Sequence, residues 1–83
     1  MMQMSKPEKL LEKIRRGDSD YCIRFDDLRT LLIGLGFSEG ISGSHHVFKM
    51  SECGIINLQP VGKEAKGYQV RQARRVLTEA GLL

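Results

Sequence analysis

The spacing of apolar residues changes twice along this chain, and these changes limit the possible folds more than any other feature. Helical spacing first occurs at Phe25, Leu28, Leu31, Leu32 and Leu35. After Gly36 the apolar residues alternate with a period of two as far as Pro60, and helical spacing returns from Gly67 to Ala80. The sequence therefore predicts a helix, a β-rich segment and a further helix.

The β-rich segment divides into three short strands, over residues 37–42, 45–50 and 55–58. The pair Gly43-Ser44 separates the first two, and the turn at residues 51–54 separates the last two. Short turns between neighbouring strands favour an antiparallel meander. We therefore expect an α+β fold in which helices cover one face of a three-stranded antiparallel sheet, in the α-β-β-β-α order of a double-stranded-RNA-binding domain.

A separate helix is predicted before this core. Ser5 is its expected N-cap, Pro7 lies in its first turn, and Glu8 completes a capping box. Gly17 ends it, and residues 21–24 are interpreted as a linker with an extended segment. With 83 residues there is room for a single core, so we divide the chain into an N-terminal extension, residues 1–24, and a domain, residues 25–83.

The charge is unevenly distributed. The net charge is +3. All of this excess lies after residue 42, in a segment that contains six basic and three acidic residues. Such asymmetry fits either a polyanionic partner or an ordinary solubility charge. Two cysteines and no apolar run long enough for a membrane span or a signal peptide predict a protein of the cytoplasm with no membrane contact.

The second predicted strand begins with two adjacent histidines. Because strand side chains alternate, His45 and Lys49 should share the open face, and His46 should lie with Phe48 on the core face. We interpret His46 as a hydrogen-bonded structural histidine. An exposed imidazole near a lysine, next to a Gly-Ser turn, has the chemistry for phosphodiester cleavage, so His45 is a candidate catalytic residue.

Other chemistry has weaker support in the sequence. The four possible zinc ligands are Cys22, His45, His46 and Cys53. They lack the paired spacing of zinc sites, and the cysteines are interpreted as buried small side chains. No glycine-rich phosphate loop is present, so we expect neither a metal nor a cofactor. The five aromatic residues are mostly in phase with the core, which argues against a surface of stacked aromatic rings.

From residue 25 onward the chain resembles the HicA family of toxins, which are mRNA interferases of toxin-antitoxin pairs. The residues that carry the resemblance are Leu35-Gly36-Phe37, Gly43-Ser44-His45-His46-Val47-Phe48, Pro60 and Leu77-Thr78-Glu79-Ala80-Gly81-Leu82. The resemblance implies a fold like that of a double-stranded-RNA-binding domain and metal-independent cleavage of mRNA. It also implies a HicB-like antitoxin as partner.

The resemblance assigns the catalytic role to His45, the histidine directly after the Gly-Ser pair. Gly43 then lets the backbone approach the RNA, and Ser44 contacts a phosphate. The remaining RNA or antitoxin contacts that it implies are Lys49, Lys63, Lys66, Arg71, Arg74 and Arg75. The chain departs from the family after Pro60, where the family often has a histidine and this chain has Val61-Gly62-Lys63.

Two other functions remain open from the sequence. The domain is then either a non-catalytic RNA-binding module of the same fold or a protein-interaction domain whose basic face binds an acidic partner. RNA turnover separates the nuclease from the binding module, and RNA affinity separates both from the interaction domain.

Overall fold

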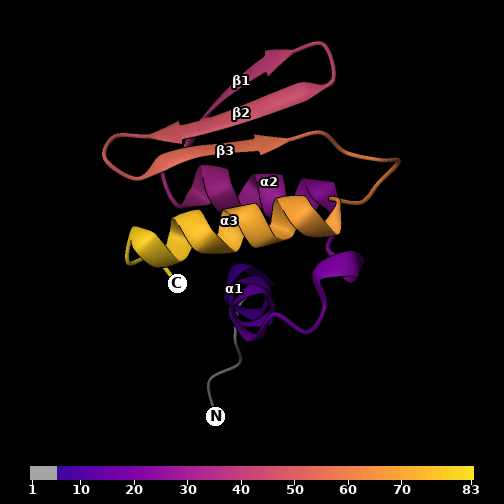
Figure 1. Ribbon diagram of the computed structural model, residues 1–83, viewed down its shortest axis with the longest axis vertical. Helices are drawn as coiled ribbons and strands as arrows, with labels where there is room; N and C mark the ends of the chain where they lie inside the picture. Colours follow the sequence, from indigo (N-terminus) through magenta and orange to yellow (C-terminus); the bar gives the residue numbers. More distant parts are fainter. Residues whose placement is uncertain (1–5) are drawn as a thin grey trace.

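A three-stranded antiparallel sheet and three α-helices make up the structure, a computed structural model that describes residues 6–83 (Figure 1). The elements in chain order are α1 (Lys6–Arg16), the short 3₁₀ helix η1 (Asp20–Cys22), α2 (Phe25–Gly34), β1 (Ser38–Ser42), β2 (His45–Met50), β3 (Gly54–Leu58) and α3 (Gly67–Glu79). The predicted α+β class and the order helix, three strands, helix are confirmed. Ser5, the predicted N-cap of the first helix, lies outside the described residues.

The strands lie in the sheet in the order β1-β2-β3, as expected for a meander. Gly43 and Ser44 form the turn between β1 and β2, and Gly43 has a φ of +60°. A two-residue hairpin loop of type II′ needs a positive φ at its first position, which glycine adopts at no steric cost. The resulting register pairs Glu39 with Phe48, so that a carboxylate side chain is placed on the inner face of the sheet.

The inner face of the sheet packs on α2 and α3, which lie side by side beneath it (Figure 1). Phe48, Ile56 and Leu58 of the sheet are fully buried there. The whole buried cluster consists of Ile14, Ile23, Phe25, Leu28, Leu31, Leu32, Phe37, Phe48, Ile56, Leu58, Ala65, Val70, Ala73, Val76 and Leu77. The apolar residues of the strands and those of the helices thus pack together in one core.

Helix α1 lies on the side of α2 and α3 away from the sheet, which makes a third layer (Figure 1). Ile14 of α1 is fully buried in the common core, and Ile23 after η1 joins it. Arg74 of α3 reinforces this contact, because its Nε donates a hydrogen bond to the carbonyl oxygen of Ile14 at 2.6 Å and its guanidinium pairs with Asp20. Residues 6–24, assigned from the sequence to an extension, therefore share a hydrophobic core with residues 25–83.

The segment between η1 and α2 is tied to the loop that precedes α3. Arg24 makes an isolated antiparallel bridge with Glu64, and the Ala65 N–H donates to the Ile23 carbonyl oxygen at 3.0 Å. The predicted extended segment is therefore limited to the end of the linker, because η1 occupies its first residues. These main-chain bonds fix the loop that leads into the N-terminal end of α3.

Candidate functional site

His45 is the first residue of β2, and its side chain is exposed. It lines a hollow of about 200 Å³ between the edge of β3 and the first turns of α3. We call this the His45 hollow; it is lined by His45, Asn57, Leu58, Gln59, Tyr68, Gln69 and Gln72. The predicted alternation of the two histidines is confirmed, because His46 is partly buried on the opposite side of the strand.

Glutamine side chains hold the walls of the His45 hollow together. Gln69 is almost fully buried, and its amide donates to the carbonyl oxygen of Gln59 at 3.2 Å. The Gln59 amide in turn donates to Ser44 Oγ at 3.3 Å, which links the hollow to the β1–β2 turn. On the other side the Asn57 N–H donates to Gln72 Oε1 at 2.7 Å. Hydrogen bonds thus connect the β1–β2 turn, the edge of β3 and α3 around the imidazole of His45.

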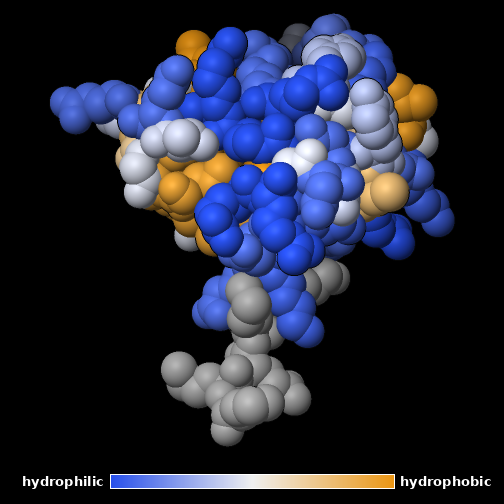
Figure 2. All heavy atoms as spheres, turned by 60° about the horizontal axis from the view of Figure 1, so that its bottom comes forward, coloured by the Kyte–Doolittle hydropathy of each residue, from blue (hydrophilic) through white to orange (hydrophobic). Residues whose placement is uncertain are grey.

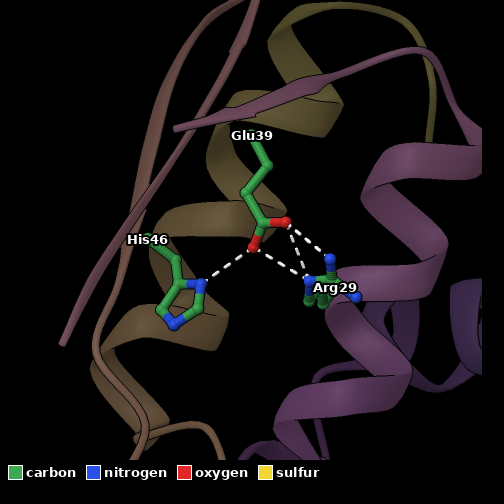
Figure 3. A network of polar contacts seen from close by, with 3 residues as sticks. All are labelled: Arg29, Glu39 and His46. Atoms are coloured by element: carbon green, nitrogen blue, oxygen red, sulfur yellow. Dashed lines mark hydrogen bonds and ion pairs between the residues drawn. The ribbon is translucent and has the colours of Figure 1, made fainter. Parts of the chain in front are cut away.

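His46 belongs to a polar network with Glu39 and Arg29, from β2, β1 and α2 respectively (Figure 3). Arg29 Nε donates to both carboxylate oxygens of Glu39, at 2.8 and 2.9 Å. His46 Nδ1 lies 2.8 Å from Glu39 Oε2, and its ring makes an edge contact with Phe25 at 4.7 Å between centroids. Since a carboxylate only accepts hydrogen bonds, Nδ1 carries the proton. His46 is therefore a hydrogen-bonded, partly buried histidine, as predicted.

Sequence reasoning missed the other two members of this network. The sequence analysis gives Arg29 and Glu39 no role, yet the Glu39 side chain is 8% exposed because its strand position faces the core. The period-two pattern of the predicted strand contained this information, since Glu39 lies two residues after the buried Phe37. The Arg29 hydrogen bonds, followed by the His46 hydrogen bond, hold the pKa of Glu39 below its ordinary value against the effect of burial.

We expect Glu39→Gln to destabilise the protein by about 2 kcal/mol at neutral pH, in line with the loss of charged hydrogen bonds. A carboxyl with a lowered folded-state pKa stabilises the fold above its unfolded-state pKa, and this contribution disappears as the pH falls through the folded-state value. The difference between wild type and variant should therefore shrink as the pH falls below the ordinary pKa of a glutamate side chain. Urea unfolding at several pH values measures it, with the exposed Glu79→Gln as control. A difference that stays constant with pH would contradict the role of the Glu39 charge.

The three lysines predicted as RNA contacts lie on different parts of the surface. Lys49 lies on the open face of the sheet beside β1, where it lines another hollow than His45 does. Lys63 lies in the loop before α3, close to Arg24. Lys66 directly precedes α3, with its Nζ 5.8 Å from the centre of the Tyr68 ring. Lys66, rather than Lys49, is thus the lysine next to the His45 hollow.

The predicted stripe of three arginines is divided between the surface and the interior. Arg71 and Arg75 are exposed on α3, as the helical spacing implies. The Arg74 guanidinium is bound within the chain, by Asp20 and the Ile14 carbonyl, so we leave it out of the surface contacts. The view onto the helical side of the molecule shows a largely hydrophilic surface with separate apolar areas between the polar side chains (Figure 2).

The aromatic residues separate into two classes. Phe25, Phe37 and Phe48 are buried in the core as predicted, whereas Tyr21 is 73% and Tyr68 is 54% exposed. The expectation that the aromatic residues are mostly in phase with the core thus holds for the three phenylalanines, and the two tyrosines are the exceptions. Tyr68 lies three residues before Arg71 and seven before Arg75, and it therefore shares the exposed face of α3 with them.

The cysteines are free, and they differ in exposure. Cys53 is half-buried, with its Sγ 3.4 Å from the sulfur of Met50. Cys22 is exposed, so its predicted burial is wrong. Within residues 6–83 no group of three or more histidine, cysteine or acidic side chains is arranged to hold a metal ion.

No helix among the described residues is both long enough and apolar enough to cross a membrane.

No protein-family model, no curated protein and no solved structure matches the chain. The function is therefore inferred from the residues around His45.

Proposed function

We propose that this chain is a metal-independent endoribonuclease of the HicA toxin type, with His45 as its catalytic imidazole. The observation that carries the proposal is the position of His45. Its exposed side chain follows the Gly43-Ser44 turn directly and lines a hollow beside the N-terminal end of α3. An accessible imidazole, with turn amides nearby, is suited to acid-base catalysis on a bound phosphodiester.

The reaction that fits one imidazole is attack of an RNA 2′-hydroxyl on the adjacent phosphorus. The imidazole of His45 takes the hydroxyl proton as the bond from phosphorus to the 2′ oxygen forms. The bond to the 5′ oxygen breaks, and this oxygen takes a proton from water. The products are a 2′,3′-cyclic phosphate and a 5′-hydroxyl. The backbone at Gly43 and the hydroxyl of Ser44 lie on the adjacent turn, where a phosphate would be held.

The architecture supports RNA as the substrate. Two helices on one face of a three-stranded antiparallel sheet agree with a fold like that of a double-stranded-RNA-binding domain. Of the basic side chains that the resemblance assigns to RNA, Lys49, Lys63, Arg71 and Arg75 are exposed and Lys66 is half-buried. In this proposal the partner is a HicB-like antitoxin that covers His45, and the toxin acts on mRNA in the cytoplasm.

The proposal predicts that the purified chain cuts a defined RNA in the presence of a chelator. The new ends should be a 2′,3′-cyclic phosphate and a 5′-hydroxyl, because the nucleophile is the 2′-hydroxyl of the substrate. Mass spectrometry of the fragments identifies these ends, and an RNA with a single 2′-deoxy substitution at the cleaved nucleotide is the matched control that should stay intact. A requirement for a divalent metal, or a 5′-phosphate product, would contradict the mechanism.

The same assay tests the alternative of a non-catalytic RNA-binding module. That function predicts RNA binding without cleavage, with an affinity that falls steeply as salt increases and when Arg71 and Arg75 are neutralised. A chain that neither cuts nor binds RNA would instead be a protein-interaction domain.

A further inference from the structure

We propose that Tyr68 is a stacking platform for an unpaired nucleobase beside the phosphate on which His45 acts. The inference rests on the proposed function, because it takes RNA as the ligand. It adds a base-binding subsite, and it makes single-stranded or looped RNA, rather than a regular duplex, the preferred substrate.

The position of Tyr68 is the first observation. It is the second residue of α3, its side chain is 54% exposed, and it lines the same hollow as His45. An aromatic ring that stays open to solvent forgoes the free energy of burial, whereas all three phenylalanines of the chain are buried. Exposed rings next to cationic side chains are the elements with which proteins bind unpaired bases. Lys66 supplies the cation, 5.8 Å from the ring centre.

The other walls of the His45 hollow favour a base over a phosphate. Apart from His45 its lining residues are uncharged, and three of them are glutamines. Gln72 lines the hollow, and its Oε1 accepts the Asn57 N–H, which leaves the two N–H groups of the same amide as donors for a ligand. A neutral surface with an aromatic ring and amide groups complements a base, which offers a flat face and hydrogen-bonding edges.

The size of the hollow agrees with a single base. Its volume of about 200 Å³ is below the range of about 300–1,000 Å³ that is typical of sites for drug-sized ligands. One heterocyclic ring system can occupy such a space. An RNA duplex would keep its bases stacked inside the helix, so the subsite needs an unpaired nucleotide.

Tyr21 provides a matched control for Tyr68. It is even more exposed, and its ring lies against Gly67, where a Cβ atom would come within 2.5 Å of it. Tyr21 does not line the His45 hollow. The two tyrosines thus share exposure and proximity to the start of α3, and they differ in access to the hollow.

The test is binding of a 2′-fluoro RNA oligonucleotide that carries 2-aminopurine, a base whose fluorescence is quenched by stacking. Without a 2′-hydroxyl this probe cannot be cut, so binding is measured apart from catalysis. We expect Tyr68→Leu to bind about 5- to 150-fold more weakly than wild type, the range for loss of one stacked base. Tyr68→Phe keeps the ring and should bind within about threefold, as should Tyr21→Leu. The same probe in a duplex should bind independently of Tyr68.

Each outcome separates this inference from the proposed function. If wild type binds the probe and folded Tyr68→Leu binds and quenches equally well, the stacking role is wrong, and the nuclease proposal stands. Equal losses in Tyr68→Phe and Tyr68→Leu would assign the effect to the hydroxyl group and overturn stacking. If wild type binds no RNA at all, the proposed function fails and this inference fails with it, which would leave Tyr68 as a protein contact.

Discussion

Replacing His45 with alanine should slow RNA cleavage by about 100- to 10,000-fold, the usual contribution of a general acid or base. The imidazole is exposed and no hydrogen bond ties it to the rest of the described chain, so its removal should change the free energy of unfolding by no more than about 0.5 kcal/mol. A single-turnover assay, with protein in excess over a labelled RNA, measures the chemical step. Affinity for an uncleavable RNA should be nearly unchanged, because the basic side chains carry most of the binding.

His46→Gln is the matched control for this experiment. A glutamine amide can still donate to the Glu39 carboxylate, so the variant should fold and should cut RNA within a few-fold of the wild-type rate. The reverse result, with His45→Ala active and folded His46→Gln inactive, would move the catalytic role to the histidine inside the Glu39 network. Thermal unfolding of both variants ensures that lost activity does not reflect a lost fold.

Arg74→Met should lower the free energy of unfolding by about 2–4 kcal/mol, because the substitution leaves two acceptors without their partner. The Asp20 carboxylate is 10% exposed, and the Ile14 carbonyl oxygen receives the Arg74 Nε at 2.6 Å. Methionine preserves much of the side-chain volume but none of the donors. In a domain of this size each kcal/mol corresponds to about 4–8 °C in the melting temperature, so the shift should be easy to measure by calorimetry.

The neighbouring Arg75→Met tests whether this effect belongs to the Asp20 pair. Arg75 is exposed on the same helix, and its replacement should change stability by less than about 0.5 kcal/mol. Asp20→Asn combined with Arg74→Met should lose less than the two single changes added together, since both remove one interaction. Equal effects of Arg74→Met and Arg75→Met would show that the contact between α3 and η1 contributes little to the fold.

The order of elements could be predicted because its determinants are local. Gly36 and Pro60 lie close to element ends, and the change of apolar period between them is visible in the sequence alone. Alternation in β2 was sufficient to place His45 outward and His46 inward. Only neighbouring residues of the chain enter these arguments.

The missed features depend on contacts between distant segments. Helical spacing groups Arg74 with Arg71, and only the position of α1 explains why its guanidinium turns inward toward a residue 60 positions away. The Glu39 network requires α2 to lie over the end of β1, which no local pattern describes. The exposure of Tyr68 follows from its place on α3, because it shares the outer face of the helix with Arg71 and Arg75 while its neighbours Gly67 and Gln69 are buried.

The hydrogen bond from the Asn57 N–H to Gln72 also affects how the molecule meets other chains. β3 is an edge strand, and the outward N–H groups of an edge strand are the points at which a foreign strand attaches. In this protein a side chain from α3 already occupies such a group near the middle of the strand. A peptide adding to that edge would have to displace the glutamine first. Gln72 thus makes strand addition at the β3 edge harder than at an edge whose N–H groups are free.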